Sequence, residues 1–170
     1  VALVTGPAAA RSVLNSANGA ASDSLDPQFV GGTGEENILN DLMVGLTTLD
    51  AAAKPIPGIA DRWTVSADGK DWTFHLRETL WSDGHPVTAD DFIFAWRRIL
   101  DPKTAASYAY FLYLIKNAEA VNGGKLPLEA LGAKALDART IEVELVHPAP
   151  YMLEMMMHQT LYPEPRHVVE

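Results

Sequence analysis

The sequence DWTFHLRETLWSDGHPVTADDFIFAWRRIL, at residues 71–100, contains the clearest folding pattern in the chain. In its first part, Trp72, Phe74 and Leu76 alternate with polar or charged residues, as the inward-facing residues of a half-buried strand do. Such a strand buries one face and leaves the other in water. We therefore expect residues 71–77 to form a strand with these three side chains in an apolar core.

The second part of this stretch predicts a helix. Thr88 lies three residues before Asp91, which is the spacing of a capping box, and acidic residues in the first turn suit the helix dipole. Apolar residues then recur at helical spacing: Phe92, Trp96, Ile99 and Leu100. Asp101-Pro102 ends the helix because proline cannot continue it.

Two β-hairpins flank this helix in the sequence. Each consists of two segments separated by a turn signal: 63–65 and 71–77 around Ala-Asp-Gly, and 133–136 and 140–146 around Asp-Ala-Arg. In the last of these segments, Ile141, Val143 and Leu145 fall on one side and are expected to face the core. Hairpins beside helices define a mixed α+β fold.

Upstream of these elements, the glycine-rich sequence VGGTG at residues 30–34 leads into an apolar helical pattern. Thr33 and Glu36 have capping-box spacing, so Thr33 is expected to be the N-cap. The apolar face predicted for this helix comprises Ile38, Leu39, Leu42, Met43 and Leu46. We also expect a first strand at residues 11–18 and a short helix at residues 151–158.

The composition excludes several classes of function. The formal net charge is -9 and there is no cysteine. An acidic surface disfavours nucleic acid as a partner, and the lack of cysteine excludes disulfides, thiolate catalysis and thiolate metal sites. No apolar run approaches the ~20 residues needed to span a bilayer. The first ten residues, VALVTGPAAA, read as the end of a processed leader or as a mature tail, so no intact signal peptide is expected.

Groups that could carry chemistry are few. None of the five histidines has the spacing of a metal motif, and there is no nucleophile elbow, P-loop or dinucleotide fingerprint. Asp83 and His85 could share a metal ion, but a solvated turn is the favoured interpretation. Four aromatic residues either line a cleft or pack in the core: Tyr108, Tyr110, Phe111 and Tyr113. We expect no metal, no cofactor and no enzyme activity, with a hydrolase as the alternative of another class.

Several motifs, spaced in one order, resemble bacterial extracellular solute-binding proteins of family 5. They are SLDP at 24–27, Trp63, WTFHLR at 72–77, WSDGHPVTADDF at 81–92, WRR at 96–98, DPKTAASYA at 101–109 and LGAKALDARTIEVEL at 131–145. The resemblance covers residues 11–170. Within the family, SYAYFLYL at 107–114 and GGKLPLEALGAKALD at 123–137 are most similar to the oligopeptide-binding branch.

This resemblance implies a fold like that of type II periplasmic binding proteins, which have two lobes around a cleft. Residues 1–43 would begin lobe I with the N-terminal tail, the first strand, the ligand-edge segment and a helix. Residues 44–166 would form a small β-rich subdomain inserted into lobe I. Residues 167–170 would return toward lobe I, and the second lobe would be absent from this chain.

The resemblance also implies a function. The family captures extended oligopeptides between its lobes and delivers them to an inner-membrane ABC permease, so we expect a periplasmic protein that is monomeric at full length. The implied ligand-binding residues are Gly31, Gly32, Thr33, Tyr108, Phe111 and His158. The family has a bulkier residue at the position of Thr33 and an acidic one near Gly31, so main-chain contacts are expected there. The alternative ligands are a dipeptide, a nickel chelate, an oligosaccharide or an opine.

Overall fold

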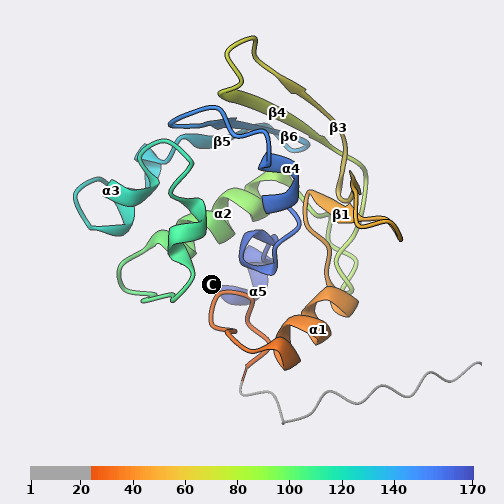
Figure 1. Cartoon of the computed structure of the whole chain (residues 1–170). Coiled ribbons are helices and arrows are strands. Elements are labelled where there is room, and N and C mark those ends of the chain that lie inside the picture. Colours follow the sequence, from red (N-terminus) through yellow and green to blue (C-terminus); the bar gives the residue numbers. More distant parts are fainter. Residues whose placement is uncertain (1–23) are drawn as a thin grey trace, which may run out of the picture.

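The computed structural model describes residues 24–170, so the strand expected at residues 11–18 lies outside the described residues. Figure 1 shows a sheet across one side of helix α2, with α1 lying away from that sheet. The elements in chain order are α1 (Thr33–Leu42), β1 (Thr47–Leu49), β2 (Pro55–Pro57), β3 (Ala60–Val65), β4 (Asp71–Leu76), α2 (Ala89–Leu100), η1 (Ala109–Leu112), α3 (Ala118–Asn122), η2 (Leu128–Ala130), β5 (Ala133–Asp137), β6 (Thr140–Glu144), α4 (Met152–Met155), η3 (Gln159–Leu161) and α5 (Arg166–Val169). None of the helices within residues 24–170 has the length and apolar character to cross a membrane.

The principal sheet has four antiparallel strands in the order β3-β4-β6-β5. The inner strands β4 and β6 pair directly, with Phe74 opposite Ile141 and Trp72 opposite Val143. All four side chains are buried, as the alternating pattern predicts. The two hairpins are thus both confirmed, and their second strands join them into one sheet although they lie far apart in the sequence.

Helix α2 packs against this sheet and supplies the middle of the core. Its predicted apolar stripe is confirmed, because Phe92, Trp96, Ile99 and Leu100 are all fully buried. The helix start is also confirmed: the main-chain N–H of Thr88 donates to the Asp91 carboxylate at 2.8 Å. At the other end the helix stops at Asp101, as the following proline requires.

The prediction for the start of α1 was wrong by one residue. Gly32 is the N-cap, with extended backbone angles, and Thr33 is the first helical residue, so no capping box with Glu36 forms. The apolar face is also smaller than predicted, since Leu39 is the buried residue of α1 while Leu42 is 67% exposed. Leu46 is buried, but it lies in the extended segment after the helix. Leu39 therefore supplies the fully buried apolar contact of α1 with the body of the protein.

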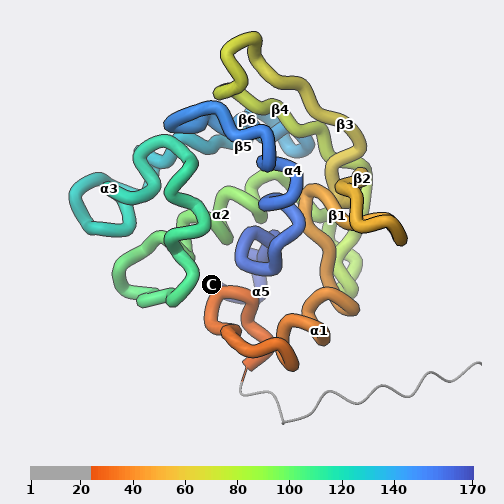
Figure 2. Tube along the Cα trace, viewed as in Figure 1, coloured from red at the N-terminus to blue at the C-terminus, as the bar shows by residue number. Residues whose placement is uncertain are grey.

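Short elements account for the other differences. Strands β1 and β2 form a separate two-stranded sheet that the sequence did not predict, because each has three residues and β2 begins and ends with proline. The helix expected at residues 151–158 is the single turn α4. Figure 2 shows the first described segment beside the last segment of the chain.

Candidate functional site

Three of the residues implied by the resemblance form one aromatic cluster, which we call the ring cluster: Tyr108, Phe111 and His158. The rings of Phe111 and His158 stack with centroids 4.3 Å apart and an interplanar angle of 22°. Tyr108 lies 5.8 Å from Phe111 and 6.4 Å from His158, again between centroids. Residues from η1 and from the turn before η3 are thus brought together across about fifty residues of sequence. All three side chains are partly exposed, so the cluster lies at the surface, with Phe111 also packed against the core.

Gly31 borders directly on the ring cluster. A Cβ atom added at Gly31 would lie 3.6 Å from Cε2 of Tyr108. Gly31, Gly32 and Thr33 are all exposed. Within residues 24–170, the N–H groups of these three residues form no main-chain hydrogen bond, and the carbonyl oxygen of Gly32 accepts one from Glu36 N–H. The structure therefore places an open main-chain segment beside an aromatic surface.

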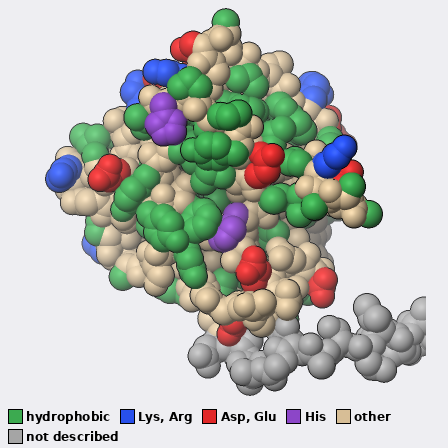
Figure 3. All heavy atoms as spheres, viewed as in Figure 1, with side chains coloured by type: hydrophobic (Ala, Val, Ile, Leu, Met, Phe, Trp, Pro, Cys, Tyr) green, Lys and Arg blue, Asp and Glu red, His purple; other side chains and the backbone are tan. Residues whose placement is uncertain are grey.

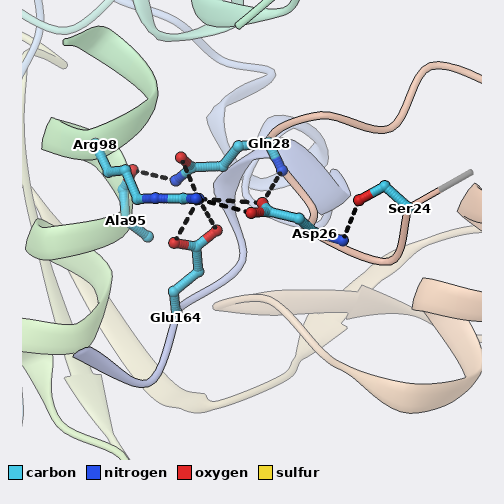
Figure 4. A network of polar contacts seen from close by, with 6 residues as sticks. All are labelled: Ser24, Asp26, Gln28, Ala95, Arg98 and Glu164. Atoms are coloured by element: carbon cyan, nitrogen blue, oxygen red, sulfur yellow. Dashed lines mark hydrogen bonds and ion pairs between the residues drawn. The ribbon is translucent and has the colours of Figure 1, made fainter. Parts of the chain in front are cut away.

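A buried polar network holds the segment that leads into Gly31 (Figure 4). Arg98 of α2 donates to both carboxylate oxygens of Asp26, at 3.1 and 2.8 Å. The same guanidinium donates to the side-chain oxygen of Gln28 at 2.9 Å and to both carboxylate oxygens of Glu164 at 3.1 Å. Gln28 also donates to the main-chain oxygen of Ala95 at 2.6 Å. Residues 26–28 are therefore fixed to the middle of the core by several hydrogen bonds at once.

The pKa values of the two carboxylates in this network are shifted in opposite directions. Burial raises the pKa of Glu164 to about 7, because Arg98 offsets only part of the cost and the carboxylate of Asp26 adds to it. Burial also acts to raise the pKa of Asp26, but hydrogen bonds from Arg98 and from Gln28 N–H outweigh it and lower that pKa. Arg98 thus forms ion pairs with two carboxylates, and Glu164 is the one that is protonated at the higher pH.

The surroundings of His158 favour its neutral form. Burial lowers the pKa of His158, and the nearby carboxylate of Glu36 offsets this only in part. The main-chain N–H of Thr160 donates to Nδ1 of His158 at 3.3 Å. In the neutral ring this contact places the proton on Nε2, which is then a donor.

A pocket of about 400 Å³ adjoins His158 and was not predicted from the sequence. Its lining includes Glu36 and Asn40 of α1 together with Met157 and Tyr162. The hydroxyl of Tyr162 donates to Oδ1 of Asn40 at 2.7 Å, and burial raises the pKa of Tyr162 to about 12. The lining residues come from segments more than a hundred residues apart, so no local pattern could have revealed the pocket. Figure 3 shows hydrophobic side chains gathered in the middle of this face around a histidine, with acidic side chains along its lower edge.

Comparison with known proteins identifies the family of this α+β chain. The sequence model of bacterial extracellular solute-binding proteins, family 5 Middle, matches residues 54–167. The chain belongs to this family. The family and the fold class expected from the sequence are thereby both confirmed.

Several individual proteins of known name or structure are similar to most of this chain. The periplasmic oligopeptide-binding protein OppA of Salmonella typhimurium is 45% identical over 156 residues, which is 90% of this chain and 28% of that protein. The solved structure of Haemophilus influenzae OppA in complex with RPPGFSPFR has a TM-score of 0.86 at 44% identity, over 89% of this chain and 30% of that one. The probable deoxycholate-binding periplasmic protein YgiS of Escherichia coli is 42% identical over 96% of this chain and 31% of that protein. The chain thus spans less than a third of these relatives, all of which are named as binding proteins.

Proposed function

We propose that this chain forms part of one side of a peptide-binding cleft, in the capture component of an ABC importer. The observation that carries the proposal is the open main chain of Gly31, Gly32 and Thr33 beside the ring cluster. Support also comes from relatives, since proteins named as oligopeptide-binding are 43–46% identical over 90% of this chain.

The mechanism follows from the chemistry of the main chain. An extended peptide can pair its own N–H and C=O groups with an exposed segment, as an added strand does at a sheet edge. Such hydrogen bonds do not depend on the ligand's side chains, so many sequences are accepted. Gly31 has no Cβ, which lets another backbone approach closely. The space that a Cβ of Gly32 would take lies against the carboxylate of Glu35, so close approach is expected at Gly31.

The ring cluster would supply contacts of a second kind. Tyr108 and Phe111 offer large, rigid apolar surfaces at a low cost in conformational entropy. Nε2–H of neutral His158 can donate to a carbonyl oxygen of the ligand without burying a charge. The neighbouring pocket of about 400 Å³ leaves room for a side chain and for bridging water.

The proposed function assigns each part of the chain to a lobe of the binding protein. Residues 1–43 begin the first lobe, 44–166 form its inserted subdomain and 167–170 return toward it, while a second lobe outside this chain closes over the ligand. The closed, monomeric protein then delivers the peptide to an inner-membrane permease. A periplasmic location is supported by relatives whose names place them there.

Calorimetry on the full-length product of the gene that encodes this chain tests the proposal. Peptides of two to five residues are titrated into the wild type and into Tyr108→Ala. We expect saturable peptide binding that Tyr108→Ala weakens by about 1–2 kcal/mol, a common cost of removing an interface aromatic. Tyr151→Ala is the matched control, because Tyr151 is 47% exposed and has no ring contact with the cluster within residues 24–170. Equal affinity of the Tyr108→Ala variant and the wild type would contradict the assignment of the site.

A second candidate function is the capture of a different solute. The relative named as a probable deoxycholate-binding protein is nearly as similar as the oligopeptide-binding ones and matches more of this chain. Deoxycholate, a nickel chelate and a cello-oligosaccharide are therefore titrated beside the peptides. Binding of one of these with no peptide binding would favour the second candidate.

A further inference from the structure

A cluster of three side chains lies outside the candidate peptide site and is not used by it. Asp83 and His85 come from the exposed turn before α2, and His167 comes from α5. Nε2 of His167 lies 2.6 Å from Oδ2 of Asp83, and Nδ1 of His85 lies 3.3 Å from Oδ1 of Asp83. The two imidazole rings face each other with centroids 4.3 Å apart. One ligand atom from each of the three residues falls within 4.8 Å of the other two.

We propose that Asp83, His85 and His167 form a binding site for a divalent transition-metal ion, with Zn²⁺ as the best match. Two imidazole nitrogens and one carboxylate oxygen are ligands that Zn²⁺ accepts, with a fourth position left for water. In a tetrahedral zinc site with bonds of about 2.0–2.1 Å, neighbouring ligand atoms lie about 3.3 Å apart. The contact between His85 and Oδ1 of Asp83 already has this length. His167 contacts the other oxygen, Oδ2, through a shorter hydrogen bond that an ion would replace, so a small rotation of the carboxylate would bring one oxygen to the ion.

The position of the site lets an ion enter without disturbing the core. The side chains of Asp83, His85 and His167 are 40%, 63% and 35% exposed. The acidic balance of the chain, with a net charge of -9, favours the approach of a cation. Mg²⁺ is a poor match, because it prefers six oxygen ligands and two of the three donors here are nitrogens.

A bound ion would join two segments that are distant in the sequence. The turn at residues 81–87 leads into α2, and α5 follows directly after Glu164 and Pro165. The same turn and the prolines before α5 line one surface groove, so both segments already lie side by side. The ion would therefore hold α5 against the start of α2, and the ring cluster would be unaffected because it shares none of these residues.

Zinc titration of the untagged chain tests the proposal, since a histidine tag would itself bind the ion. We expect saturable binding of one Zn²⁺ per chain and no comparable binding of Mg²⁺. Changes to residues that only support metal ligands cost roughly 10–100-fold in affinity, so His85→Gln and His167→Gln should each cost at least about tenfold. His147→Gln is the matched control, because His147 is also exposed and lies outside the cluster, and it should leave affinity unchanged.

A spectroscopic measurement adds a readout that does not depend on the measured affinity. Co²⁺ in a four-coordinate site with nitrogen ligands gives intense visible absorption, whereas hydrated Co²⁺ absorbs weakly. We expect the intense bands with the wild type and with His147→Gln, and their loss in His85→Gln. Absence of saturable Zn²⁺ binding, a Co²⁺ spectrum like that of the free ion, or a Zn²⁺ affinity in His85→Gln and His167→Gln equal to that of the wild type would each overturn the proposal.

Discussion

Replacing Arg98 with methionine should destabilise the fold, because Arg98 is the cation that pairs with both Asp26 and Glu164. The methionine keeps the length of the aliphatic part of the side chain but donates no hydrogen bond. Glu164, whose side chain is 3% exposed, and Asp26, at 30%, would then face each other without the arginine, although Gln28 N–H would still donate to Asp26. Gln28 would lose its hydrogen bond to Arg98 as well.

The size of the loss can be estimated from burial. Removing one partner of a buried ion pair costs about 3–5 kcal/mol, because the other charge remains buried and unpaired. Arg98 is 22% exposed, so water can partly replace it, and the lower end of this range applies. We expect the free energy of unfolding to fall by about 3 kcal/mol at pH 8. The loss should be smaller at pH 5, where Glu164 is protonated because its pKa is about 7.

Urea unfolding followed by tryptophan fluorescence measures this change, since Trp96 lies on the same helix and is fully buried. The matched control is Arg62→Met, which removes an arginine that is 67% exposed and forms an ion pair with its neighbour Asp61. An exposed pair of this kind contributes about 0–1 kcal/mol. A loss below about 1 kcal/mol in Arg98→Met, or equal losses in the two variants, would show that the network does not hold residues 26–28 in place.

Three further predictions concern the core, the buried acid and the open main chain. Phe74→Ala should lower the free energy of unfolding by about 3–5 kcal/mol in urea titration, because Phe74 is fully buried at the centre of the sheet, whereas Leu136→Ala, at a side chain 51% exposed, should change it little. Glu164 has a folded pKa of about 7, above its ordinary 4.5, so its contribution to stability is full below pH 4.5 and is lost as pH rises through 7; thermal unfolding at several pH values should show this fall, and Glu164→Gln should flatten it. Gly31→Val in the full-length gene product should weaken peptide binding by tenfold or more in calorimetry, because its side chain would occupy the surface beside Tyr108, and unchanged affinity would argue against main-chain pairing there.

Local sequence patterns predicted the parts of the fold that depend on local periodicity. The alternation at residues 71–77 and the stripe along α2 each bury their side chains as expected, because burial on one face imposes a period of two or of about four residues. The short strands β1 and β2 gave no such signal, since three residues are too few to show a period. At α1 the capping-box spacing predicted Thr33 as the N-cap, which is wrong. Gly32 adopts the extended conformation that an N-cap needs, and the helix begins at Thr33.

The candidate sites show where sequence reasoning stops. Each residue of the ring cluster was named through the family resemblance, but only the structure shows that the rings stack and that Gly31 borders them. Contacts across long sequence separations have no local signature: Arg98 meets Asp26 from 72 positions away, and His167 meets Asp83 from 84. The sequence favours a plain solvated turn at Asp83 and His85, and it gives no local signal that His167 lies beside them.

The most direct test of peptide capture is a crystal structure of the full-length gene product with a bound tripeptide. We expect main-chain atoms of the ligand within about 3 Å of the N–H and C=O groups of residues 31–33. We also expect Tyr108 and His158 in contact with the ligand. A tripeptide bound elsewhere, with residues 31–33 still facing solvent, would contradict the account.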